Sequence, residues 1–304
     1  LEHYHGSDTF LSEALTIEAK QQIASAVEDK QPFFLEFAHY AVHAPFQSDS
    51  RFAAHYENSG KPKNAQAFAT LIEGMDKSLG DILDYLEVLE IAENTLVLFL
   101  GDNGSDAPLG PVHSHTSSFP LRAKKGTHYE GGIRVPFIAS WAKPSEKNQN
   151  QRRLPIPANA IQEQMGTVID IYPTILSAVG VEPPAGHILD GTDLKTQLEG
   201  RKNLSRDERF LMHFPHAHRS SYFTSFRDGD WKIIYHFKPN DNPAKTQYEL
   251  FNLASDPYEN ENLAQKKPKV LKRMMETLVA ALQAESALYP VNADGSEMQP
   301  EIPQ

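Results

Sequence analysis

The chain has 304 residues, of which 40% are hydrophobic and 10% aromatic, a globular composition that excludes general disorder. Its 40 acidic and 29 basic residues give a formal net charge of -11, which argues against a non-specific nucleic-acid binder but permits a local cationic pocket. Because there is no cysteine, the sequence offers no disulfide, thiolate metal site or cysteine nucleophile. The apolar runs are too short to span a bilayer, and the first residues do not resemble a signal peptide.

Alternating helices and strands are predicted over the first two thirds of the chain. Thr16 is a candidate N-cap, and the apolar residues after it predict a helix over residues 16–27. The run PFFLEFA, residues 32–38, predicts a short buried strand with a loop at its carboxyl end. Apolar residues at steps of three and four predict an amphipathic helix of about six turns over residues 64–87.

Two further strands and a helix follow. TLVLFL, residues 95–100, is a continuous apolar run of the kind that parallel sheets bury on both faces. VPFIASW, residues 135–141, predicts another strand, and residues 168–180 predict a helix that ends at Gly180. This succession of strands, loops and helices indicates an α/β layered fold.

The pattern changes near residue 205. The turn sequence RDGD within residues 222–237 predicts a β-hairpin, and YELFNL, residues 248–253, predicts another strand. A terminal amphipathic helix is predicted by apolar residues at helical spacing: Leu271, Met274, Met275, Leu278 and Leu282. We therefore predict two domains, residues 1–205 and 206–304, the second being a small antiparallel sheet with one helix.

Three candidate sites follow predicted strands. Asp102 and Asn103, in GDNG, offer a carboxylate and an amide oxygen that can ligate a hard cation such as Ca²⁺ at a strand end. The same tetrapeptide is also typical of a plain turn, and that alternative stays open. In RAKKGTHYEGGIRVP, residues 122–136, Lys125 and its neighbouring cations and glycines suit an anion-binding loop, although such runs are usually solvated surface.

The third candidate is His43, in the loop after residues 32–38. A histidine in such a place is more often structural than catalytic. Pro45 biases Ala44 toward an extended conformation, which would help to project His43 into the same crevice as the other two sites.

Together these stretches resemble the type I sulfatases of the alkaline-phosphatase superfamily. LVLFLGDNG, PLRAKKGTHYEGGIRVPFIASW and VIDIYPTILSAVG are similar to successive signatures of that family, and FFLEFAHYAVHAPF is similar to its histidine loop. The closing RDGDWKIIYHF and YELFNLASDPYENENLA resemble its C-terminal subdomain, so the resemblance extends nearly from end to end. It implies an alkaline-phosphatase-like α/β/α sandwich, with residues 1–205 as the second half of the catalytic domain.

The resemblance also implies an activity and roles for the candidate residues. The protein would hydrolyse a sulfate ester with Ca²⁺, and its partner would be a sulfated small molecule or glycan. Asp102 and Asn103 would be two of the Ca²⁺ ligands, and Lys125 would contact a sulfate oxygen and the leaving-group side. His43 would contact the sulfate and act as general acid toward the leaving alcohol. The family resemblance further implies a periplasmic or secreted location.

The sequence departs from this family in its nucleophile. Type I sulfatases convert a cysteine or serine in a C/S-x-P-x-R motif to formylglycine, and an acidic pair near the N-terminus supplies further Ca²⁺ ligands. This chain has no cysteine and no Asp-Asp pair, and we expect no serine form of the motif. We therefore expect these groups in an N-terminal half outside this chain, which alone would be inactive. A phosphatase or phosphonate hydrolase of the same superfamily, or a non-catalytic module that binds sulfated glycans, remain alternatives.

Substrate contacts are expected in MHFPHAHRSSYF, residues 212–223. His213 and His216 are three residues apart around Phe214-Pro215, which suggests a bent segment with both rings directed into a cleft. Imidazole can donate and accept hydrogen bonds with a carbohydrate hydroxyl, so these residues, together with His128 and Tyr222, favour a sulfated sugar over a simple aryl ester. His218 and Arg219 are instead expected at a solvated strand end.

Overall fold

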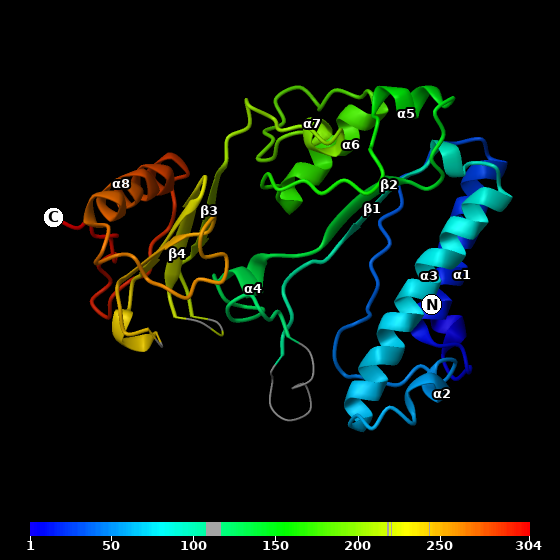
Figure 1. Ribbon diagram of the computed structural model, residues 1–304, viewed down its shortest axis with the longest axis horizontal. Helices are drawn as coiled ribbons and strands as arrows, with labels where there is room; N and C mark the ends of the chain where they lie inside the picture. Colours follow the sequence, from blue (N-terminus) through cyan, green and yellow to red (C-terminus); the bar gives the residue numbers. More distant parts are fainter. Residues whose placement is uncertain (108–116, 218, 220, 243) are drawn as a thin grey trace. The chain divides into compact units, whose positions relative to one another are not determined.

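The computed structural model describes residues 1–107, 117–217, 219, 221–242 and 244–304 (Figure 1). The chain divides into two compact units, the first made of Leu1–Phe99 and Phe137–Asn203 and the second of Leu100–Pro136 and Leu204–Gln304. The predicted division at residue 205 into half of a catalytic domain and a C-terminal subdomain stays a prediction. Residues 100–136, which that prediction assigns to the first part, are grouped with the second compact unit.

Two long helices pack against each other in the first unit, α1 (Leu11–Glu28) and α3 (Lys63–Val88) (Figure 1). Apolar residues of these helices and of the turn after α3 form one buried cluster: Ala19, Ile23, Ile82, Leu86 and Ala92. The helix predicted over residues 64–87 is therefore confirmed to within one residue at each end.

The start of α1 differs from the prediction. Thr16 is buried inside the helix, which begins at Leu11, and its hydroxyl donates to the carbonyl oxygen of Ser12 at 2.6 Å. The predicted N-cap is wrong because a threonine hydroxyl can bond one turn back within a helix instead of capping its first turn.

Residues 32–38 also differ from the prediction. They are extended but pair with none of the described strands, and Phe34 is 71% exposed. A strand needs a neighbour to satisfy its backbone groups, so an apolar run alone does not make one. The buried strand predicted there is absent from the described part of the chain.

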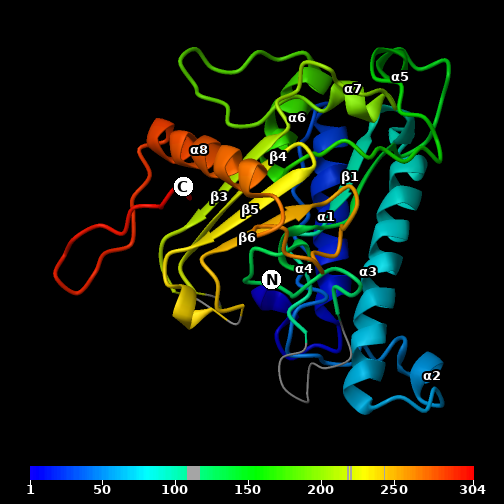
Figure 2. The ribbon, with the colours of Figure 1, turned by 60° about the vertical axis from the view of Figure 1, so that its left-hand side comes forward.

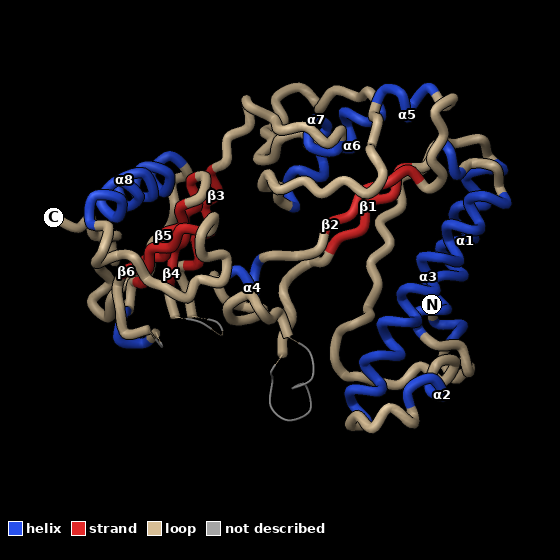
Figure 3. The backbone as a smooth tube through the Cα atoms, viewed as in Figure 1, coloured by secondary structure: helices blue, strands red, loops and turns tan. Residues whose placement is uncertain are grey.

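Strands β1 (Leu96–Leu100) and β2 (Phe137–Trp141) form a two-stranded sheet (Figure 3). Gly101 N–H donates to the carbonyl oxygen of Pro136 at 3.1 Å, and Ala142 N–H donates to that of Thr95 at 2.9 Å. The start of one strand thus pairs with the end of the other, so β1 and β2 are antiparallel and not the parallel neighbours that the apolar run suggested. Both strands were predicted from sequence, and their existence is confirmed.

The remaining helices of the first unit are short. Helix α6 (Ile171–Val179) ends at Gly180, whose φ of 70° is the left-handed conformation that favours glycine after a helix, as predicted. The other helical segments are α2 (Ala53–Tyr56), α5 (Gln149–Arg153), α7 (Lys195–Leu198) and the 3₁₀ turns Glu2–Tyr4, Ala92–Asn94 and Val168–Asp170. None of the helices in the described residues has the length and apolar character needed to cross a membrane.

The second unit is built on a four-stranded antiparallel sheet. Strands β3 (Arg209–Phe214), β4 (Phe223–Asp228), β5 (Trp231–His236) and β6 (Tyr248–Asn252) are neighbours in chain order. The predicted hairpin is β4–β5, with Gly229 at a φ of 57° in its turn. Strand β3 was not predicted. The unit also contains α4 (Glu130–Ile133) and a 3₁₀ turn at Pro239–Asp241.

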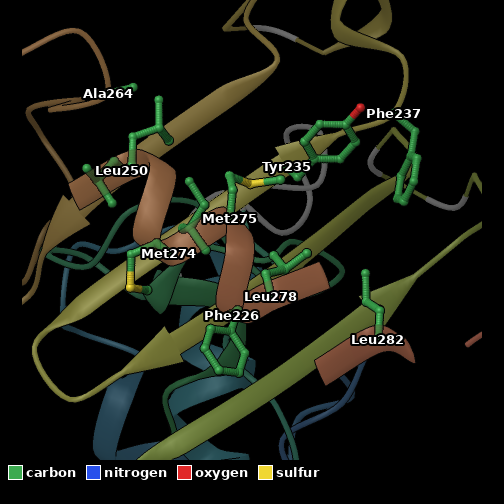
Figure 4. Packing of buried hydrophobic residues seen from close by; sticks show 11 residues of the cluster. Phe226, Tyr235, Phe237, Leu250, Ala264, Met274, Met275, Leu278 and Leu282 are labelled. Carbon is green, nitrogen blue, oxygen red and sulfur yellow. The ribbon is translucent and has the colours of Figure 1, made fainter. Parts of the chain in front are cut away.

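Helix α8 (Pro268–Ala284) lies across one face of this sheet (Figure 2). Its five predicted core residues are all buried, and Phe226, Ile233, Tyr235 and Leu250 of the sheet join them in the main cluster (Figure 4). Burying each such side chain contributes about 1.5–3 kcal/mol. Because side chains alternate along a strand, the residues between these point to the opposite face, where Phe223, Ile234 and Phe251 form a second cluster that packs against Tyr129.

Candidate active site

The end of β1 and the segment that contains Lys125 are in direct backbone contact within the second unit. We call residues 122–134 the lysine loop. Gly104 N–H donates to the carbonyl oxygen of Gly132 at 3.1 Å, and Lys125 N–H donates to that of Ser105 at 2.9 Å. The structure therefore brings together two of the three predicted sites, the Asp102-Asn103 strand end and the lysine loop.

Glycine is required where these two segments meet. A Cβ atom on Gly104 would lie 1.8 Å from the carbonyl oxygen of Gly131, and one on Gly131 would lie 2.4 Å from that of Arg122. A Cβ on Gly132 would lie 2.5 Å from the carbonyl oxygen of Thr127. The Gly-Gly pair thus permits a backbone-to-backbone approach that no larger residue allows.

The side chains of Asp102 and Asn103 have the chemistry of a hard-cation site. Asp102 is exposed and Asn103 half-buried, and neither side chain forms a hydrogen bond or ion pair with any described residue. Carboxylate and amide oxygens are suitable ligands for Ca²⁺, but a Ca²⁺ ion takes six to eight oxygens, so these two side chains fit as part of a ligand set.

The cations of the lysine loop have different surroundings. Lys125 is half-buried, and its ammonium group has no ion pair with the described residues. Arg122, in contrast, forms an ion pair with Glu249 at 3.2 Å. The expectation that all cations of this block serve an anion is therefore wrong for Arg122, whose charge is used inside the protein.

Arg122 belongs to a buried network with Tyr129 and β6. Its guanidinium lies 3.9 Å over the Tyr129 ring and donates to the Tyr129 hydroxyl at 3.1 Å, while Tyr129 donates to Glu249 at 2.5 Å. Burial alone would raise the pKa of Glu249, but hydrogen bonds from His236 and Tyr129 and the Arg122 charge bring that pKa below its ordinary value. Glu249 is thus a buried carboxylate that holds the first half of the loop.

A second buried network holds the other half. Lys232 Nζ, on β5, lies 2.8 Å from Oε1 of Glu130 and 2.8 Å from Oε1 of Glu259. Oε2 of Glu259 accepts the backbone N–H of Glu130 at 2.7 Å. Burial raises the pKa of Glu259, and the Lys232 charge opposes that rise. Because one cation serves two carboxylates here, the network depends on Lys232.

His128, predicted to contact substrate, is 3% exposed and lies inside the protein. Its ring is 4.2 Å from that of Phe223 and 5.1 Å from that of His236, measured between ring centroids. Burial, followed by the charges of His236, Lys232 and Arg122, lowers its pKa well below the ordinary histidine value. A neutral, enclosed imidazole is a packing element in this structure, which corrects the predicted substrate contact.

His128, His236 and Glu249 also form the one group of potential metal ligands found among the described residues, with ligand atoms within 4.8 Å of one another. The Glu249 carboxylate already accepts from Arg122, Tyr129 and His236. The charges of Lys232 and Arg122, which contribute to the lowered pKa of His128, would also repel a divalent cation. We therefore assign this group to the buried network and not to a metal centre.

The other predicted residues lie in two places. His43 is in the first unit, exposed, with its Nδ1 2.7 Å from the carbonyl oxygen of Ala44. His213, on β3, is half-buried, and its Nε2 lies 2.6 Å from the carbonyl oxygen of Leu288. His216 is exposed and packs on the ring of Phe214 at 3.9 Å. Their proposed roles stay predictions.

Arg219 and His218 were both expected at a solvated strand end. Arg219 forms an ion pair with Asp106, while His218 lies outside the described residues.

Residues 118–122, SFPLR, match the five letters of S-x-P-x-R, so the expectation that the sequence has no such match is wrong. Ser118 Oγ accepts the backbone N–H of Ser105 at 3.0 Å, and the arginine of this match is the half-buried Arg122, which is paired with Glu249; both contacts point to a structural role for these residues.

Comparison with known proteins identifies the family. Residues 3–181 match the model of the sulfatase family, and residues 123–286 match a model described as N-sulphoglucosamine sulphohydrolase, C-terminal. The chain therefore belongs to the sulfatase family, whose members are sulfuric ester hydrolases and whose chemistry implies a metal ion.

The chain is similar to several characterised relatives over part of their length. It is 31% identical to steryl-sulfatase of Homo sapiens over 240 residues, which cover 77% of this chain and 37% of that protein. It is 33% identical to N-acetylgalactosamine-6-sulfatase of Canis lupus familiaris over 194 residues, which cover 64% of this chain and 33% of that protein. The chain thus spans about a third of the length of these relatives.

The fold agrees with this assignment. The crystal structure of Ps i-CgsB in complex with k-i-k-neocarrahexaose superposes with a TM-score of 0.73 at 25% identity, covering 94% of this chain and 56% of that one. The expected alkaline-phosphatase-like α/β fold with a small C-terminal antiparallel sheet is confirmed.

Proposed function

We propose that this chain supplies the metal-binding strand end and the sulfate-binding loop of an enzyme that hydrolyses a sulfate ester of a carbohydrate. The observation that carries the proposal is the backbone contact between Gly104 and Gly132. This contact holds the segment with Asp102 and Asn103 against the lysine loop in one compact unit. A sugar substrate is supported by the name of the canine N-acetylgalactosamine-6-sulfatase and by the neocarrahexaose bound to Ps i-CgsB.

Each residue has a role in this proposal. Asp102 and Asn103 would hold Ca²⁺, which would stabilise negative charge on the sulfate oxygens when bound. Lys125 donates to a sulfate oxygen on the leaving-group side, because a fixed cation in a water-poor site stabilises charge that develops there. As a nucleophile from a segment outside this chain bonds to sulfur and the bond from sulfur to the ester oxygen breaks, His43 would give its proton to the departing alcohol oxygen.

The nucleophile and the remaining metal ligands are assigned to a segment outside these 304 residues. The chain has no cysteine to become formylglycine, and its S-x-P-x-R match uses an arginine that is committed to Glu249. A periplasmic or secreted location is part of the same proposal.

The test is a Lys125→Ala substitution in the full-length protein. Loss of one positioned electrostatic group should lower kcat/KM on a sulfate ester by about 100-fold or more. Lys269→Ala, which removes an exposed lysine of α8 in the same unit, is the matched control and should leave turnover unchanged. Normal turnover by a folded Lys125→Ala protein would refute the role.

Phosphate and phosphonate esters assayed beside the sulfate ester separate the superfamily alternatives. We expect the sulfate ester to be the preferred substrate by kcat/KM. A preference for a phosphate or phosphonate ester would make the protein a phosphatase or phosphonate hydrolase. Binding of sulfated glycan without turnover of any ester by the full-length protein would favour the non-catalytic alternative.

A further inference from the structure

The lysine loop is anchored on both sides of Lys125. Arg122, three residues before it, is fixed to Glu249 and also donates to the carbonyl oxygen of Glu259 at 3.0 Å. Glu130, five residues after it, is fixed to Lys232 and Glu259. Only residues 123–129 lie between these two anchors, so the position of Lys125 is set by contacts that its own side chain does not make.

Lys232 holds the second anchor from the sheet. Strand alternation puts Lys232, Ile234 and His236 on the face of β5 opposite α8, and Lys232 is 2% exposed. Its two carboxylate partners come from outside the sheet, Glu130 from the loop and Glu259 from the segment after β6. Since Glu259 also accepts the amide of Glu130, the ammonium fixes the start of α4 both directly and through Glu259.

The glycine contacts pass this constraint on to Lys125. Glu130 immediately precedes the glycine pair, and Gly131 N–H donates to the carbonyl oxygen of Arg122 at 2.8 Å. The carbonyl oxygen of Gly132 accepts the backbone N–H of Gly104. The carbonyl oxygen of the next residue, Ser105, accepts the backbone N–H of Lys125. A shift of Glu130 therefore displaces the backbone contacts on which the amide of Lys125 depends.

We propose that Lys232 is a positioning residue for Lys125: it fixes the lysine loop on the C-terminal sheet and so sets the place from which Lys125 meets an anion. The inference rests on the proposed role of Lys125 toward sulfate. Lys232 itself is enclosed by protein and acts only through Glu130 and Glu259.

Hydrogen exchange tests the structural half of this inference. In Lys232→Met, amide exchange in residues 122–134 should accelerate by about tenfold or more relative to α8, because the loop opens locally while the core stays closed. Ile233→Val, which removes one methyl group from the main cluster beside the same site, is the control for general loss of stability. Exchange that rises equally in the loop and in α8, or does not rise at all, would overturn the proposal.

Glu130→Gln is the second variant, in case Lys232→Met does not fold. It keeps the side-chain volume and leaves the Lys232–Glu259 pair in place, so the protein should fold. Amide exchange in residues 122–134 should then accelerate less than in Lys232→Met. An unchanged loop in this variant, together with an unfolded Lys232→Met protein, would also count against the proposal.

A double-mutant cycle tests whether Lys232 acts through Lys125. With inorganic sulfate as the probe in an NMR titration, Lys125→Ala should weaken binding about tenfold, as expected for a lost charged hydrogen bond. Lys232→Met should also weaken it, but not further when Lys125 is already alanine, because coupled residues are not additive. Fully additive losses would show that Lys232 stabilises the unit without positioning the lysine.

The two proposals fail in different ways. If Lys125→Ala leaves sulfate binding unchanged, or the wild-type protein binds none, the proposed function loses its anion contact and the exchange measurement alone decides the role of Lys232. If Lys125→Ala weakens binding but the loop in Lys232→Met exchanges as in wild type, the proposed function stands and the positioning role is refuted.

Discussion

The amide of Gly104 donates to the carbonyl oxygen of Gly132 at 3.1 Å, and this bond joins the segment after β1 to the lysine loop. This bond brings the segment with the carboxylate–amide pair into contact with the glycine-rich cationic block that follows it in the sequence.

Gly104→Ala should destabilise the protein by about 1–3 kcal/mol, the usual range for overpacking. The added methyl carbon would lie 1.8 Å from the carbonyl oxygen of Gly131, so the strand end and the loop must separate. Gly80→Ala in α3 is the control, since its Cβ meets no atom within 4 Å and a helical alanine is favourable by about 0.5–1 kcal/mol. Chemical denaturation measures both, and equal stabilities of the two variants would contradict this account.

Stability should fall as the pH is lowered below the ordinary histidine pKa of about 6.5, by up to about 1.4 kcal/mol per pH unit for His128. The sign follows from the lowered pKa of His128: in this window the unfolded chain binds a proton that the folded protein excludes. His128→Leu should reduce this slope by about one proton. Denaturation at pH 7.5, 6.5 and 5.5 gives the slopes, and an unchanged slope in His128→Leu would count against a neutral buried ring.

Ca²⁺ should bind the 304-residue chain weakly, with a Kd of about 1 mM or above, because one carboxylate and one amide supply too few oxygens. Asp102→Asn should remove even this binding, since it removes the negative charge of the site. Isothermal titration calorimetry measures both proteins. Micromolar affinity in the wild-type chain would mean that the ligand set is complete without groups from elsewhere.

His216→Ala in the full-length protein should lower activity on a sulfated oligosaccharide more than on a small aryl sulfate. The exposed imidazole, packed on Phe214, is free to bond to a sugar hydroxyl that the aryl ester lacks. The same assays on His213→Ala give a comparison, because the His213 ring already contacts a backbone carbonyl. Equal losses on both substrates, or no loss, would show that His216 does not recognise sugar.

Elements with a long repeating pattern were predictable. Helices α3 and α8 and the β4–β5 hairpin follow directly from apolar spacing and from the RDGD turn. Residues 32–38 were mispredicted because strand formation needs a partner that local sequence does not specify. Strand β3 escaped prediction because its histidine and proline surroundings suggested a bent loop.

The candidate site was predictable only in part. The positions of Asp102, Asn103 and Lys125 followed from motifs, but the partners of the lysine loop did not. Arg122 and Glu249 are 127 residues apart, and Glu130 and Glu259 are 129 apart, so no local pattern connects them. His128 was predicted to contact substrate, and only the tertiary structure shows that it is buried against Phe223 and His236 of the sheet.

The distance in sequence between Glu130 and Glu259 also orders events during synthesis. At typical translation rates, Glu259, which is 129 positions later in the chain, takes on the order of 10 s to emerge after Glu130 does. At the start of that interval the paired helices α1 and α3 have all their residues, whereas the lysine loop has neither Lys232, which emerges later, nor Glu259, which emerges last. The loop that is proposed to bind sulfate therefore gains its last anchor late, and a premature stop just before residue 259 would release a chain that lacks the contacts of Glu259 with Arg122, Glu130 and Lys232.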